Sequence, residues 1–305
     1  MALDITSEQF CPTIGATSVD AVVRLLSESF GDDIDSVLTE RYEKMGQNFK
    51  DVPFDDERWD QSCGCRNVRY KRNGRSYYKD ALLCVNRQKH LKSRFWSGIS
   101  DYYNLGLDLP VWFCTTHKPK HQVMIISQDP ERVWHPEKNL YLSTPWGVHS
   151  CQYTASQGAR NSVNLIGQLL SCDTAVYFTD YVKFYFSSSP LSKGDNGLKL
   201  IDRMNLQNEL LGGNCNLQDV LKKEIEMVNP DLLVTFGTWI RDSGFWPLSF
   251  EPMNFNARDI AIYERKGATL FHPNVHDKKN VAALKAKDYW PIDRYFKKAF
   301  DELLK

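Results

Sequence analysis

The chain has 305 residues, 12% aromatic residues and a formal net charge of zero, which is typical of a globular protein with one large domain or a domain plus an extension. No apolar run is long enough to span a bilayer, and the N-terminus lacks a basic segment followed by an apolar one. These features argue against a membrane protein, and we expect a cytoplasmic one.

Residues 1–108 are predicted to form a mostly helical extension. Apolar spacing between Ser18 and Tyr42 predicts two short amphipathic helices. Asn73-Gly74, between two short runs rich in tyrosine, predicts a β-hairpin, and a helix is expected over Gln88–Tyr103.

Charge is distributed unevenly in this extension. Residues 1–60 hold fourteen Asp or Glu against five Lys or Arg, whereas residues 66–94 hold ten Lys or Arg against one acid. Basic side chains mixed with aromatic rings suit a phosphate backbone and unstacked bases; the alternative is a solvated surface neutralised by the acidic segment. The candidate DNA contacts of this basic segment are Arg72, Arg75, Lys89, Lys92 and Arg94.

The eight cysteines favour reduced thiols over a disulfide framework in a cytosolic chain of this size. Cys63 and Cys65 are one residue apart and Cys84 follows, but zinc and iron–sulfur sites usually need repeated Cys-x₂-Cys pairs. We expect no metal, with a structural metal at these cysteines as the alternative.

From residue 109 to 305 the pattern changes to short continuous apolar runs that alternate with helical patterns. The runs predict strands buried on both faces. They lie at 111–114, 123–126, 175–178, 232–236, 260–263 and 268–271, with helical patterns at 161–170 and 216–228. This order predicts an α/β domain with a mainly parallel central sheet in a three-layer α/β/α arrangement.

Three polar motifs follow or end these apolar runs: Gln128-Asp129-Pro130, Thr179-Asp180 and His272-Pro273-Asn274. Open α/β sheets bind their ligands at the carboxyl ends of strands. The motifs are therefore expected at one edge of the sheet.

The order of these motifs resembles the uracil-DNA glycosylase superfamily. Its members carry a Gly-Gln-Asp-Pro-like motif, a strand end bearing asparagine, and a late His-Pro-Ser loop. The resemblance covers roughly residues 110–290. It implies a uracil-DNA glycosylase-like fold, DNA as the partner, and a monomeric enzyme that releases a flipped base without a cofactor.

On this resemblance Asp129 is the acid that positions water and stabilises the cation-like sugar, and Gln128 faces the base. The alternative is that Asp129 only starts a turn. Uracil-specific members have a tyrosine that blocks C5 of the base where this chain has Glu131, so the space near C5 would be open or lined by polar groups. The alternative is that another residue, such as Trp134 or Tyr141, closes the pocket. Trp146, in Pro-Trp-Gly, is the candidate stacking ring, with Tyr141 in reserve and core packing as the alternative role.

Asp180 occupies the position of the asparagine that reads uracil, and Lys183 follows it as in the family's segment. A carboxyl group accepts a hydrogen bond from the cytosine amino group, and in protonated form it also donates one to N3. Asp180 with Glu131 therefore indicates a 5-substituted cytosine, hydroxymethylated or glucosylated as in phage DNA, and antiviral defence as the biological role. The alternative is a structural hydrogen bond of Asp180 at a strand end.

His272 resembles the late histidine that donates to O2 of the departing base, with His135, His149 and His276 as rival candidates. Residues after it in this family fill the gap left by the flipped nucleotide and hold phosphates. The candidates for these DNA contacts are Asn274, Val275, His276, Lys278 and Lys279, with Lys183 added from the second motif.

We therefore predict a monofunctional DNA glycosylase. The first alternative is a uracil-DNA glycosylase of base-excision repair with unusual pocket residues. The second is a catalytically inert DNA-binding module on the same fold. An unrelated nucleotide-dependent α/β enzyme is disfavoured, because the chain has neither Gly-x-Gly-x-x-Gly nor a Walker loop.

Overall fold

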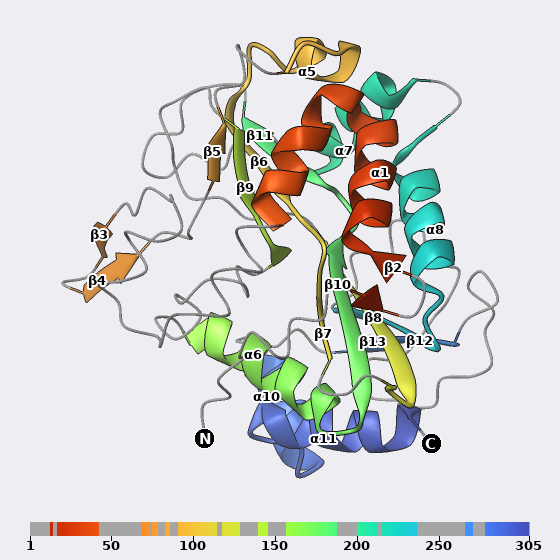
Figure 1. Ribbon diagram of the computed structural model, residues 1–305. Coiled ribbons are helices and arrows are strands. Elements are labelled where there is room, and N and C mark those ends of the chain that lie inside the picture. The colour runs from red at the N-terminus through yellow and green to blue at the C-terminus, as the bar shows by residue number, and fades with distance from the viewer. Residues whose placement is uncertain are drawn as a thin grey trace.

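The computed structural model describes residues 13–14, 17–42, 69–72, 75–78, 83–85, 91–114, 118–128, 140–145, 157–187, 200–212, 215–236, 266–270 and 278–304. Within these ranges the chain is a mixed α/β protein with a mostly parallel five-stranded sheet and N-terminal helices (Figure 1). The coarse fold class predicted from the sequence is confirmed.

The five-stranded sheet has the strand order β13-β12-β8-β10-β7. Its strands are β7 Val111–Phe113, β8 His121–Ser127, β10 Thr174–Asp180, β12 Leu232–Phe236 and β13 Lys266–Leu270. Only the edge strand β7 is antiparallel to its neighbour; the other pairs are parallel. All residues of β10 and β12 are buried, as expected for parallel strands covered on both faces. The predicted run at 260–263 lies outside the described residues.

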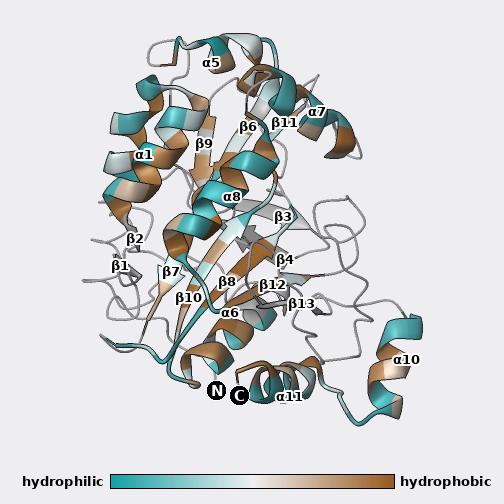
Figure 2. Cartoon of the chain, turned by 90° about the vertical axis from the view of Figure 1, so that its right-hand side faces the viewer, coloured by the Kyte–Doolittle hydropathy of each residue, from teal (hydrophilic) through white to brown (hydrophobic). Residues whose placement is uncertain are grey.

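Helices flank this sheet on both sides. Figures 1 and 2 show α1 and α8 together on one side, and α6 with α11 on the other. The helices are α1 Val19–Phe30, η2 Asp32–Ile34, α5 Arg94–Gly98, α6 Gln157–Leu170, α7 Leu200–Leu211, α8 Leu217–Val228, α10 Lys278–Ala286 and α11 Ile292–Leu303. A further helical segment covers 35–42. Helix α11 buries Tyr295, Phe296 and Phe300, whose spacing of one to four residues makes a single apolar face.

A second sheet, which the sequence did not predict, has the order β11-β6-β9-β5. Its strands are β5 Leu83–Val85, β6 Tyr103–Asp108, β9 Leu140–Ser143 and β11 Phe184–Ser187. The helix expected over Gln88–Tyr103 is reduced to α5, and β6 begins at Tyr103. Leu105, Gly106, Leu107 and Asp108 of β6 are all buried, so this part of the strand is covered on both faces.

The N-terminal region shares one core with the rest of the chain. Phe30 of α1 and Phe95 of α5 contact Phe184 of β11, with ring centroids 4.7 Å and 5.0 Å from it. Trp96 packs edge-on against the same ring at 5.2 Å. Residues on both sides of the predicted 108/109 boundary thus belong to a single hydrophobic cluster.

The expected hairpin is present as β3 Arg69–Arg72 and β4 Arg75–Tyr78, which pair antiparallel with Arg72 opposite Arg75. A shorter pair, β1 Thr13–Ile14 and β2 Thr17–Ser18, precedes α1. After α1 the chain turns at Gly31, whose φ of 111° favours glycine.

Candidate functional site

The carboxyl ends of four parallel strands meet at one edge of the five-stranded sheet. Asp180 at the end of β10 is in register with Ser127 at the end of β8. On the other side of β8, β12 and then β13 end at the same edge, with Phe236 opposite Leu270. The chain leaves β8 towards β10 and leaves β12 towards β13, so the strand order reverses between β8 and β12. Ligands of open α/β sheets bind at such a reversal.

The first and second predicted motifs contact each other at this edge. The hydroxyl of Ser127 donates a hydrogen bond to Oδ1 of Asp180, and both residues are buried. The backbone N–H of Tyr181 donates to the carbonyl of Ser127 at 2.9 Å, and that of Val182 donates to the carbonyl of Gln128 at 3.0 Å. The turn after β10 is therefore docked on the residues that lead directly into Asp129.

Asp180 is 1% exposed. The Ser127 hydroxyl is the kind of partner that a purely structural aspartate at a strand end would have. The same contact also orients the carboxyl group, because a donor on one oxygen fixes its rotation.

Lys183 is the main correction among the predicted DNA contacts. Its side chain is 0% exposed, and its ammonium donates to Glu224 Oε2 at 2.6 Å and to Thr179 Oγ1 at 2.5 Å. Glu224 lies on α8 and is 1% exposed. A buried ammonium that is already paired has no surface to offer a phosphate, so Lys183 is a structural residue of the turn.

Tyr177 completes this buried polar group. Its hydroxyl donates to Glu224 Oε1 at 2.7 Å. Burial raises the pKa of the Tyr177 phenol well above its usual value, and the Glu224 carboxylate raises it further. This group was not predictable from the sequence, since Glu224 is one of several charged residues on an amphipathic helix.

A second pair of residues missed from the sequence lies on β12 and β13. The hydroxyls of Thr235 and Thr269 are 3.0 Å apart and buried, one residue before the ends of their strands. Each is a single polar residue between two apolar ones near the end of a strand, which is the signal by which it could have been found.

Several predicted site residues lie outside the described residues: Lys89, Asp129, Glu131, Trp146, His272, Asn274, Val275 and His276. Tyr141, Arg72 and Arg75 lie on described strands, but the positions of their side chains are not described. The expectations for these residues stay predictions.

The described basic candidates do not form one surface. Lys92 and Arg94 are exposed beside α5, whereas Lys278 is exposed at the start of α10. Figures 1 and 2 both place α5 and α10 at opposite ends of the molecule.

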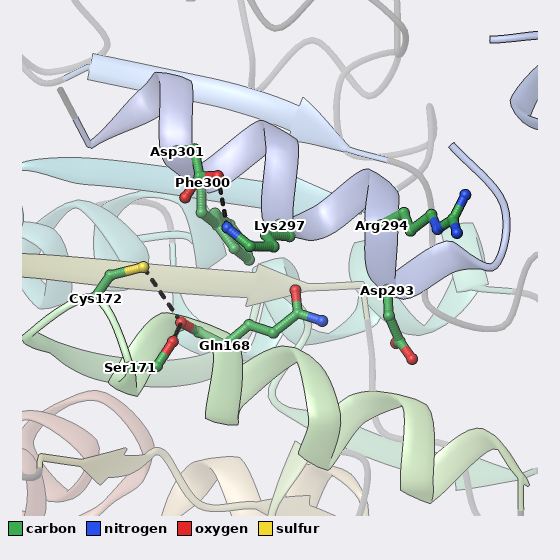
Figure 3. A pocket seen from close by; sticks show the side chains of 8 residues that line it. All are labelled: Gln168, Ser171, Cys172, Asp293, Arg294, Lys297, Phe300 and Asp301. Atoms are coloured by element: carbon green, nitrogen blue, oxygen red, sulfur yellow. Dashed lines mark hydrogen bonds and ion pairs between the residues drawn. The ribbon is translucent and has the colours of Figure 1, made fainter. Parts of the chain in front are cut away.

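A pocket of about 260 Å³ lies between α6 and α11 (Figure 3). Its lining residues are Gln168, Ser171, Cys172, Asp293, Arg294, Lys297, Phe300 and Asp301. Burial raises the pKa of Asp293, and Lys297 pairs with Asp301 at 2.9 Å. Cys172 lies two residues before β10, so this end of the pocket is near the amino end of the strand, whereas Asp180 lies at its carboxyl end.

In the part of the chain that the structure describes, no group of three or more His, Cys, Asp or Glu side chains is arranged to hold a metal ion. Cys63 and Cys65 fall outside that part. Among the described helices, none combines the length and the apolar character needed to cross a membrane.

Comparison with known proteins adds no family to this description. No protein-family model matches the chain, and no curated protein matches its sequence.

Proposed function

We propose that this protein is a monofunctional DNA glycosylase that flips out and excises a 5-substituted cytosine, hydroxymethylated or glucosylated, and leaves an abasic site. The observation that carries the proposal is the contact between the ends of β8 and β10. It joins Ser127 to Asp180 directly, and Asp129 follows Ser127 by two residues.

The proposed reaction needs two carboxyl groups with different roles at the same edge of the sheet. Excision develops positive charge on the sugar, which a carboxylate beneath it stabilises, and this is the role proposed for Asp129. Reading cytosine asks for an acceptor opposite its amino group, and this is the role proposed for Asp180. The Ser127 hydroxyl supports this role, because it holds the Asp180 carboxyl in one rotation.

The finer fold assignment belongs to the same proposal. A three-layer sandwich of the uracil-DNA glycosylase type would have α1 with α8, and α6 with α11, as its outer layers. In that arrangement His272, two residues after β13, would approach the base from the side of the sheet opposite β10. Removal of marked phage DNA in the cytoplasm, by a protein acting as a monomer, is the proposed biological role.

The test is base release from synthetic duplex and single-stranded DNA carrying cytosine, 5-hydroxymethylcytosine, glucosylated 5-hydroxymethylcytosine or uracil. We expect alkali-labile abasic sites from the 5-substituted cytosines alone. Abasic sites from uracil alone would replace the proposal with the repair enzyme. Binding of DNA without release of any base would replace it with the inert module.

Two variants test the catalytic roles. Asp129→Ala and His272→Ala are expected to lower the single-turnover rate by at least about 10²-fold, the usual contribution of a positioned acid or base, and to leave DNA affinity unchanged. Asp202→Ala, on the exposed side of α7, is the matched control and is expected to keep the wild-type rate.

A further inference from the structure

The buried ion pair between Lys183 and Glu224 has no role in the chemistry described so far. It joins two chain segments, since Lys183 lies in the turn that follows Asp180 and Glu224 lies on α8. Their side chains are 0% and 1% exposed and 2.6 Å apart. A pair so deeply buried loses the hydration of both charges, and replacing it by apolar residues of similar volume is often neutral or stabilising. Stability alone therefore does not account for it.

The hydrogen bonds of Lys183 bracket Asp180. The ammonium bonds forward to Glu224 and back to Thr179, the residue before Asp180. Tyr177, two residues further back on the same strand, bonds to the other oxygen of Glu224. One carboxylate on α8 thus holds β10 on one side of Asp180 and the turn on the other side.

Successive side chains of a strand point to opposite faces of the sheet, and this sets the direction of these contacts. Tyr177 and Thr179 project from one face of the sheet, towards α8, and Asp180 projects from the other face, where Ser127 meets it. The ion pair therefore supports the strand end from the face opposite the Asp180 carboxyl. It touches neither the proposed base nor the proposed sugar site.

We propose that Lys183 and Glu224 are positioning residues that fix the end of β10 against β8, so that Asp180 meets the base in one orientation. This inference rests on the proposed function for its catalytic consequence. The docking of the turn itself, through the N–H groups of Tyr181 and Val182, is independent of any activity.

The experiment uses the full chain with the double substitution Lys183→Met/Glu224→Leu, which removes both charges and leaves neither partner buried alone. The matched control is Gln207→Met, which removes a buried side chain bonded to both backbone groups of Phe184, the residue after Lys183, and leaves the ion pair in place. Thermal unfolding shows that each variant folds and how stable it is.

Two measurements then decide the proposal. Hydrogen exchange of the Tyr181 and Val182 amides is expected to become at least about tenfold faster in the double variant and to stay unchanged in Gln207→Met. The single-turnover rate on the best substrate is expected to fall at least about tenfold with unchanged DNA affinity, since a misplacement of about 1 Å can cost about 10²-fold.

Wild-type exchange and a wild-type rate in the double variant would overturn the proposal. Equal losses in Gln207→Met would also overturn it, because they would show that losing any buried contact beside the turn has the same effect as losing the ion pair. If the wild-type protein releases no base from any substrate, the proposed function fails, and the exchange measurement still decides whether the ion pair fixes the turn.

Discussion

The side chain of Asp180 is where the proposed specificity resides. Asn in its place would offer an amide that donates to uracil O4 and accepts from N3, whereas Asp offers oxygen atoms alone. We expect Asp180→Asn to lower release of 5-substituted cytosine and raise release of uracil, each by about tenfold or more. A mismatch of one such base contact costs about 1–3 kcal/mol, and 1.4 kcal/mol is tenfold in rate.

Competition between cytosine and uracil substrates in one reaction measures this change directly. Ser127→Ala is the control, because it removes the hydroxyl that holds Asp180 and keeps the carboxyl group. It is expected to slow release and keep the cytosine preference. Equal preference shifts in both variants would mean that Asp180 acts only as a structural residue.

Tyr177 links the buried polar group to the pH dependence of stability. Burial raises the pKa of its phenol well above the usual value of about 10, and Glu224 and Tyr42 raise it further. Above about pH 10 the unfolded chain therefore releases the Tyr177 proton, whereas the folded chain keeps it. This contribution to stability is therefore complete below about pH 10 and is lost as the pH rises beyond it.

We expect the free energy of unfolding to decrease steadily above about pH 10. Tyr177→Phe leaves one Glu224 oxygen without its donor, so stability at neutral pH is expected to fall by about 1–3 kcal/mol, while the alkaline decrease becomes shallower. Chemical denaturation across the pH range measures both effects. Tyr103→Phe, at a partly exposed position on β6, serves as the comparison, and an identical alkaline slope in Tyr177→Phe would contradict the assignment.

At the scale of single elements, α8 has the clearest boundaries. Asn216 accepts a hydrogen bond from the N–H of Asp219, and the Asp219 carboxylate accepts one from the N–H of Asn216, both at 3.0 Å. Asn229 ends the helix in the left-handed conformation, with φ 52° and ψ 53°. The side chains of Asn216 and Asp219 satisfy backbone N–H groups that the helix leaves unpaired at its start.

Removing this cap tests how far α8 depends on it. We expect Asn216→Ala to cost about 1 kcal/mol and to lower Tm by roughly 2 °C. When Asp219→Ala is combined with Asn216→Ala, the loss of stability is expected to be smaller than the sum of the two single losses, because the two side chains form one reciprocal pair. Lys223→Ala, exposed on the same helix, is the control, and a loss of similar size there would trace the effect to helix propensity.

Elements with a strong local signal were predictable from the sequence. The continuous apolar runs at 175–178 and 232–236 became β10 and β12, and the spacing at 216–228 became α8. The strands of the second sheet were missed because they lack a strong local signal: β6 mixes Asn, Gly and Asp with its two leucines, and β5 has only three residues. Their partners are also far away in the chain: β6 pairs with β11, about eighty residues later. Pairing at that distance leaves little mark on local periodicity.

The candidate site was likewise predictable only where the sequence carries a strong local signal. Placing Ser127, Asp180 and their neighbours at strand ends followed from the ends of apolar runs. The burial of Lys183 was not predictable in this way, because a lysine in a turn is usually exposed. Its burial depends on Glu224, which is 41 positions away and reaches it through the packing of α8 on the sheet.

At the scale of the whole molecule, the core crosses the predicted boundary between the N-terminal extension and the catalytic domain. β6, which ends at Asp108, lies between β11 and β9 in the second sheet, and α1 packs on α8. Cutting the chain at 108 removes the strand that joins β9 to β11, and it exposes the side of α8 that α1 covers.

We therefore expect a fragment of residues 109–305 to lack a cooperative unfolding transition, and the full chain to unfold in one. The fragment loses the buried side chains of Phe30, Phe95 and Trp96. Truncating a single buried aromatic residue costs about 3–5 kcal/mol, whereas a whole domain is stable by only about 5–15 kcal/mol. Calorimetry and near-ultraviolet circular dichroism measure the difference.

A chain that lacks only residues 1–16 is the control, because it retains α1 and is expected to keep the transition. A cooperative unfolding transition in 109–305 would contradict this prediction, because it would show that the core of the domain is complete without the N-terminal region.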